Sequence, residues 1–208
     1  MGFRGRSAVL AGALLVVLCG CSGDGGDEQP SRSTGVDPGW YDALEEAVAD
    51  AGQVSGMPVL SRGPCPIDTP VVAGEELDDT PDVGVSTLGD SGHRLICSWS
   101  PPATDLVVSR FEDPAELELA REEVGTVGEE DNGANRQRTS AITVGEREIY
   151  VRRTVYPTND THIDYAAWYL DDENLGMVLL DVEAGDERDL VQSYDTQQAA
   201  EDLAALLS

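Results

Sequence analysis

The stretch TSAITVGEREIYVRRTVYPTNDTHIDYAAWYLDDENLGMVLLDVE, residues 139–183, decides the fold. It holds four segments rich in the β-branched and aromatic residues that favour strands, at 139–144, 147–156, 162–170 and 176–183. The separators Gly145-Glu146, PTNDT and DDENL are typical of hairpin turns. Because short turns join antiparallel neighbours, the stretch predicts an antiparallel meander.

Three shorter strands and three helices are predicted around this meander. The strands cover 83–88, 93–99 and 105–111, and GDSG between the first two is a candidate hairpin turn. The helices cover 38–51, 113–125 and 195–208, and each follows or begins with an aspartate suited to capping, at Asp37, Asp113 and Asp195. Their apolar residues recur at helical spacing, so each helix has one face to bury.

The remaining segments of this region are predicted to be loops. Residues 58–82 are rich in Pro, Gly and Asp, with at most a short helical turn, and 126–138 is a charged surface loop. Together, the elements predict an α+β domain in which helices pack on one face of an antiparallel sheet.

The first twenty residues are typical of a secretory signal peptide. Arg4 and Arg6 precede an uncharged run from Ala8 to Gly20. This run of 13 residues is too short to cross a hydrocarbon core of about 30 Å as a helix. The sequence Leu18-Cys19-Gly20-Cys21 resembles the lipobox of bacterial lipoproteins, in which the last cysteine receives a diacylglyceryl group and the leader is cut before it. The resemblance implies that Cys21 is a lipid anchor; a soluble secreted protein is the alternative.

The residues after this cysteine are predicted to be a flexible tether. Residues 21–36 hold Gly, Ser, Asp, Glu and Pro with almost no apolar side chain, so they cannot form a core. The expected organisation is therefore a signal peptide at 1–20, a lipidated acidic tether at 21–36 and a single extracytoplasmic domain at 37–208.

The charge of the chain excludes one large class of partner. Its 40 acidic residues outnumber 13 basic ones, all of them Arg, which gives a net charge of −27. Removal of a leader containing Arg4 and Arg6 makes the charge −29. A phosphate backbone would be repelled, so no nucleic-acid partner is expected. Anionic lipid would be repelled as well, so contact with the membrane is expected through the covalent lipid alone.

Two cysteines fall inside the predicted domain. Export places Cys65 and Cys97 in an oxidising compartment, where a disulfide is the expected state and two free thiols are the alternative. Zinc needs about four ligands, and only His93 and His162 would join the two cysteines, so no metal site is predicted there.

Together, these features carry a family resemblance. A lipobox, an acidic tether, a cysteine near the domain start and the later Cys97-Ser98-Trp99 resemble the small uncharacterised lipoproteins of actinobacteria. Some extracellular sensor domains of actinobacterial membrane kinases are similar at this level. The resemblance implies an anchored domain outside the cell, without a general activity to carry over.

Several short motifs suggest chemistry but do not fit it. GDSG at 89–92 matches the serine-protease nucleophile motif in four letters, yet no histidine precedes Ser91. The acidic segments 128–133 and 171–176 depart from the calcium-loop pattern, so a hairpin tip is favoured and a weak calcium site is the alternative. No cofactor is predicted.

One group of residues is a candidate binding face. Tyr150, Arg152 and Tyr156 alternate along the strand 147–156, so they point to the same side of the sheet. Trp168 or Tyr169 of the next strand would complete a set of aromatic rings around a guanidinium. The alternative is an ordinary half-covered sheet face.

The sequence thus predicts a membrane-anchored extracytoplasmic lipoprotein that is not an enzyme. We expect a binding module for an envelope ligand or a protein partner. The alternatives are a sensor or regulatory subunit of a membrane kinase or transporter, and an enzyme of unrecognised type.

Overall fold

The computed structural model describes residues 35–52, 54–58, 60–78, 80–88, 92–100, 103–156, 162–184 and 194–208. Its elements, in chain order, are α1 (Pro38–Ala51), β1 (Ser61–Arg62), β2 (Val71–Val72), β3 (Glu75–Glu76), β4 (Asp82–Leu88), β5 (Gly92–Trp99), β6 (Thr104–Phe111), α2 (Pro114–Gly125), β7 (Gly128–Asp131), β8 (Arg136–Val144), β9 (Arg147–Tyr156), β10 (His162–Asp171), β11 (Gly176–Ala184) and α3 (Thr196–Leu206). The three predicted helices are present, and the predicted aspartate caps are confirmed. Asp37, Asp113 and Asp195 each accept a hydrogen bond from a backbone N–H of the first turn, at 2.8–2.9 Å.

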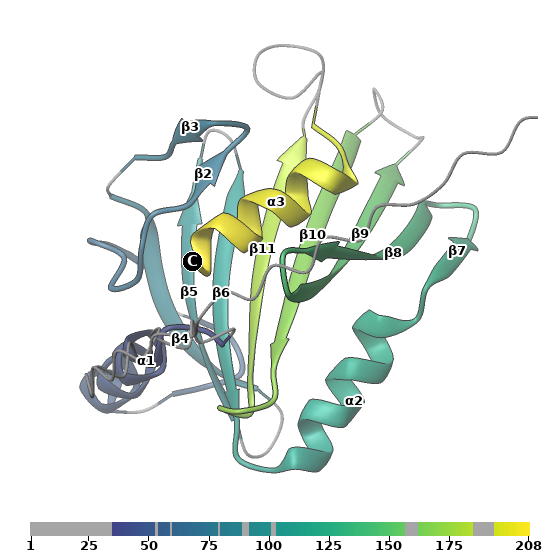
Figure 1. Cartoon of the computed structure of the whole chain (residues 1–208). Helices are drawn as coiled ribbons and strands as arrows, with labels where there is room; N and C mark the ends of the chain where they lie inside the picture. Colours follow the sequence, from purple (N-terminus) through teal and green to yellow (C-terminus); the bar gives the residue numbers. More distant parts are fainter. Residues whose placement is uncertain are drawn as a thin grey trace, which may run out of the picture. The chain divides into compact units, whose positions relative to one another are not determined.

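A large antiparallel sheet forms the centre of the domain (Figure 1). Within the described residues its strand order is β1-β4-β5-β6-β11-β10-β9-β8-β7. The predicted meander is confirmed, because β8, β9, β10 and β11 are consecutive antiparallel neighbours. A second meander, β4-β5-β6, joins the first where β6 pairs with β11, with Val108 opposite Val178. The α+β class with an antiparallel sheet is therefore confirmed.

The helices divide between the two faces of this sheet. Helices α1 and α3 cover one face, and their buried Leu44 and Leu203 share a core with sheet residues such as Leu106 and Leu180. Helix α2 packs on the opposite face, where its Leu117 joins a separate core. The expectation of helices on one face therefore holds for α1 and α3. Helix α2 covers the opposite face. The strand before it, β6, ends at Phe111, whose side chain lies in the second core, so the short segment from β6 to α2 begins on that face.

The face assignment follows from alternation along the strands. On β10, Tyr165 and Ala167 belong to the core under α1 and α3, whereas Ala166, Trp168 and Leu170 belong to the core under α2. Both faces of the central strands are thus apolar, as expected for strands covered on two sides.

Two loops predicted from sequence contain strands. Residues 128–131 form the edge strand β7, which pairs with β8. Its side chains are all exposed, and ion pairs Arg136–Asp131 (3.1 Å) and Arg138–Glu129 (3.7 Å) cross to its neighbour. The prediction of a loop at 128–131 was wrong because this strand lacks the alternation of apolar and polar residues that usually indicates a strand. The segment 58–82, predicted to be a loop with at most a short helical turn, contains the short strands β1, β2 and β3.

The predicted disulfide between Cys65 and Cys97 is confirmed, with Cα atoms 5.9 Å apart. Cys97 is fully buried in β5, so the bridge holds the loop around Cys65 against the sheet. The two cysteines are 32 residues apart, and closing such a loop in the unfolded chain contributes about 3.5 kcal/mol in the chain-entropy account.

The start of the domain lies slightly earlier than the sequence suggests. Gly35 and Val36 were assigned to the tether, yet both are buried, and Val36 is only 1% exposed within the main core. The predicted leader, Cys21 and the rest of the tether lie outside the described residues. None of the described helices is long and apolar enough to cross a membrane.

Candidate functional site

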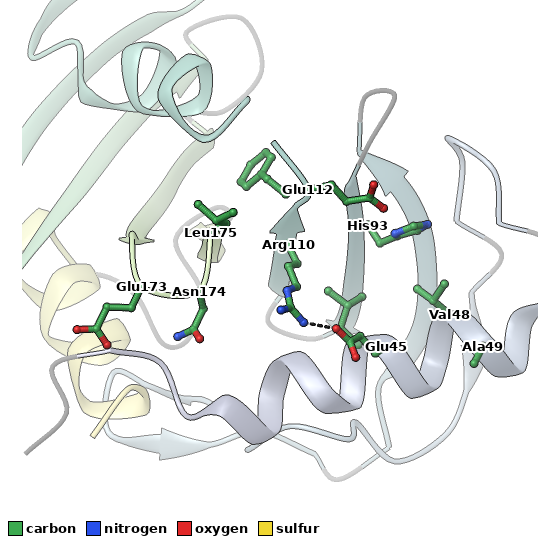
Figure 2. Close-up of a pocket in the computed structure, with 11 residues that line it drawn as sticks. Glu45, Val48, Ala49, His93, Arg110, Glu112, Glu173, Asn174 and Leu175 are labelled. Carbon is green, nitrogen blue, oxygen red and sulfur yellow. Dashed lines mark hydrogen bonds and ion pairs between the residues drawn. The ribbon is translucent and has the colours of Figure 1, made fainter. Parts of the chain in front are cut away.

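A cleft of about 630 Å³ lies between α1, the end of β6 and the turn that joins β10 to β11 (Figure 2). Its size is within the range of small-molecule sites. Its lining comprises the apolar side chains Leu44, Val48, Ala49, Phe111 and Leu175, and the polar ones Glu45, His93, Arg110, Glu112, Glu173 and Asn174. The Phe111 side chain belongs to the core under α2, so the apolar floor of the cleft is formed by Leu44, Val48 and Ala49 of α1, and its rim is charged.

Arg110 lies in the middle of this cleft (Figure 2). Its guanidinium forms an ion pair with Glu45 of α1 and lies over the Tyr41 ring, 5.9 Å from the ring centroid. His93 of β5 is directly opposite Arg110 in the sheet register, so both side chains emerge on the α1 face. Because the Arg110 and Glu45 side chains are 42% and 63% exposed, their ion pair contributes only about 0.2–1 kcal/mol.

The buried carboxylate of Asp171 lies next to the turn that lines the cleft. Asp171 is 1% exposed and ends β10. Its Oδ2 accepts hydrogen bonds from the Tyr41 hydroxyl (3.1 Å), the Val36 N–H (3.2 Å) and the Asn174 side-chain amide (2.9 Å). Burial, followed by the charge of Asp171, raises the pKa of Tyr41, so its hydroxyl stays protonated and donates. Asp171 thereby connects the first residues of the domain, α1 and the cleft residue Asn174.

The turn after Asp171 has two conformational requirements. A Cβ at Gly176 would overlap the Tyr41 ring, so only glycine allows α1 to approach β11 this closely. Leu175 has φ of 51°, a left-handed conformation that costs about 1–2 kcal/mol for a non-glycine residue. Its carbonyl accepts from the Phe111 N–H at 2.8 Å, which holds the strained residue at the cleft wall. Backbone strain of this kind is concentrated at functional sites.

A second cavity of about 440 Å³ lies where α2 meets β7 and β8. Its lining is almost entirely polar: Glu122, Glu123, Thr126, Gly128, Glu129, Glu130, Gln137, Thr139 and Arg152. Ligand sites are mostly apolar with a few well-placed polar groups. The cleft beside α1 has more apolar lining than the second cavity, so it is the better candidate.

The structure brings together part of the predicted binding face. The Arg152 guanidinium lies 5.1 Å from the centroid of the Trp168 ring, and Tyr150 belongs to the same core as Trp168. This core lies under α2, and Trp168 is only 8% exposed. Arg152 also donates to the Glu123 carbonyl in the last turn of α2 at 3.0 Å. These contacts give Arg152 and Trp168 a role in holding α2, and their role in ligand binding stays a prediction.

Tyr156, the fourth residue of that face, lies nearer a group of carboxylates. Burial and the neighbouring Asp164 raise the pKa of Tyr156. Across the same sheet face, Asp181 of β11 is directly opposite Asp105 of β6, and Glu183 is opposite Asp164. Partial burial, and then the charges of Asp164, Asp105 and Glu183, raise the pKa of Asp181 to about 6.

The remaining predicted motifs are structural where they can be seen. Strands β4 and β5 pair antiparallel up to Leu88 and Gly92, which fits a hairpin at GDSG, but residues 89–91 lie outside the described residues. In the candidate calcium segment 171–176, the Asp171 oxygens accept hydrogen bonds from protein donors. In segment 128–133, Asp131 Oδ1 accepts from the Gly133 N–H at 2.9 Å. No group of three or more His, Cys, Asp or Glu in the described ranges is placed to hold a metal.

Sequence reasoning missed most of the cleft. Arg110 and His93 were within predicted strands, and antiparallel pairing of 93–99 with 105–111 was the available signal that they are neighbours. Nothing in the sequence indicated that α1 would pass beside them, because Glu45 is 65 residues from Arg110. In comparisons with known proteins, the chain matches no protein-family model and no curated protein.

The raised pKa of Asp181 predicts a pH-dependent stability. The Asp181 carboxyl binds a proton more tightly in the folded state than in the unfolded state, where its pKa is near 3.8. Protonation of Asp181 therefore stabilises the fold at low pH, and this stabilisation is lost as the pH rises from about 4 through 6. Asp181→Asn removes the charge, so we expect the variant to exceed the wild type in unfolding free energy by about 1–3 kcal/mol at pH 7.5. The difference should shrink toward pH 4. Urea unfolding at several pH values measures it.

The exposed Glu76 of β3 provides the matched control, because Glu76→Gln removes one charge away from this cluster. A constant difference between Asp181→Asn and the wild type from pH 4 to 7.5 would contradict the assignment.

Proposed function

We propose that the chain is a membrane-anchored extracytoplasmic lipoprotein that binds a small envelope ligand in the cleft beside α1, without catalysis. The cleft carries the proposal: an apolar floor of Leu44, Val48 and Ala49 on α1 lies beneath a rim that holds Arg110 and His93. Such a combination buries the apolar part of a ligand and orients its polar part. The disulfide supports an oxidising location outside the cytoplasm.

The arrangement of the polar groups favours binding over catalysis. Among the described residues that line the cleft there is no Ser, Thr, Cys, Lys or Tyr side chain to serve as a nucleophile. Its three glutamates are spread around the rim and do not converge on one point (Figure 2).

Fragment binding tests the cleft. We expect small aromatic fragments to perturb the NMR methyl signals of Leu44, Val48 and Leu175. Ala49→Trp, an exposed position on α1 at the cleft, should fill the space and weaken binding by at least about tenfold, or about 1.4 kcal/mol. Ala115→Trp, exposed on α2, is the matched control and should bind normally. Perturbations elsewhere on the protein, or equal binding by both variants, would refute the assignment of this cleft.

Cysteine substitution tests the anchor. Wild-type chain expressed in its natural host should partition into detergent, and its mass should show acyl chains on a new N-terminus at Cys21, because two or more chains are needed for stable attachment. Cys21→Ser should abolish both properties. Cys19→Ser changes the neighbouring cysteine and should leave both intact. Release of Cys19→Ser from the membrane, or retention of a processed Cys21→Ser, would contradict the proposed anchor.

A further inference from the structure

The charges around the cleft indicate what kind of ligand fits it. The cleft lining holds three carboxylates, Glu45, Glu112 and Glu173, and a single guanidinium, that of Arg110. Salt screens exposed charges beyond about 8–10 Å, so these local groups dominate the potential felt by a bound ligand. The excess of carboxylate at the rim therefore attracts a cation and repels an anion.

The positive charge of Arg110 is already compensated. Glu45 pairs with its guanidinium on one side, and the Tyr41 ring lies against it at 5.9 Å from the centroid. An anionic ligand would have to displace Glu45 from Arg110, and the displaced carboxylate would then repel the negative charge of the ligand. Among the described residues, Glu112 and Glu173 have no ion-pair partner, so they remain available to a cationic ligand.

The placement of the carboxylates leaves room for an apolar body. In Figure 2, Glu173 lies at one end of the cleft and Glu112 lies toward the other, beyond Arg110. Leu44, Val48 and Ala49 of α1 supply the apolar surface of the cleft, and Leu175 borders it at the β10–β11 turn. A ligand along this surface has a carboxylate within reach at its end, while its hydrocarbon or aromatic part leaves water.

We propose that the cleft selects small amphipathic cations, in which an amine or guanidinium is attached to an apolar body. This inference rests on the proposed function, because it names the ligand class of the same cleft. The apolar floor supplies affinity, and Glu112 and Glu173 supply the preference for positive charge.

A series of three probes with one apolar body tests this selectivity: 4-phenylbutylamine, 4-phenylbutan-1-ol and 5-phenylpentanoate. The full chain is titrated with each probe, and the shifts of the Leu175 and Val48 methyl signals in NMR spectra give a Kd for each probe. We expect the amine to bind most tightly. The carboxylate should bind about tenfold more weakly than the amine, because two exposed ion pairs contribute a difference in binding free energy of this size. High salt should reduce this difference.

Variants separate the role of charge from that of shape. Glu112→Gln with Glu173→Gln should weaken binding of the amine by about 3- to 10-fold and leave binding of the alcohol unchanged. Both side chains are exposed, so the fold is preserved. Glu76→Gln on β3 is the control and should change neither affinity.

Each outcome has a distinct meaning. Alcohol or carboxylate binding as tightly as the amine would overturn the charge selectivity and leave the proposed ligand cleft intact. An unchanged preference in the double variant would also overturn it. Absence of binding by all three probes would refute the proposed binding function itself, and the selectivity with it.

Discussion

The buried carboxylate of Asp171 is the constraint on which the arrangement of the domain depends. A carboxylate removed from water is costly unless hydrogen-bond donors satisfy it. Donors from three separate places do so: Val36 and Tyr41, which are 135 and 130 residues away in sequence, and the adjacent Asn174. The start of the domain and α1 are therefore fixed against the end of β10, and misplacing either would leave buried polar groups without partners.

The candidate cleft is a consequence of this arrangement. Tyr41 reaches Asp171 because Gly176 leaves space for its ring, and this position of α1 brings Glu45 to Arg110. The turn that carries Asn174 also carries the strained Leu175, which lines the cleft. The same contacts that stabilise the fold thus place an apolar floor beside a charged rim. Any binding function of this cleft relies on residues from α1, β6 and the β10–β11 turn, which are far apart in the chain.

The sequence predicts the elements of this fold better than it predicts their contacts. The strands of the meander were recognisable because β-branched and aromatic residues recur between turn residues, and the helices because an aspartate precedes each apolar stripe. Strand β7 was missed because ion pairs to β8 replace the apolar alternation. The role of Asp171 was also invisible, since it depends on partners more than 100 residues away. Arg152 contacts Trp168 in the core under α2, and one-dimensional patterns do not tell which face of a sheet a helix will cover.

Hydrogen exchange in Asp171→Asn tests most directly whether this carboxylate holds α1 on the sheet. Asparagine keeps the size of the side chain but removes one acceptor and the charge, a loss of about 1–3 kcal/mol. The account predicts that protection of the Val36 amide and of the α1 amides falls by at least about tenfold, whereas amides of the β9–β10 pair keep theirs. Unchanged protection of Val36 and α1 in a folded variant would contradict it.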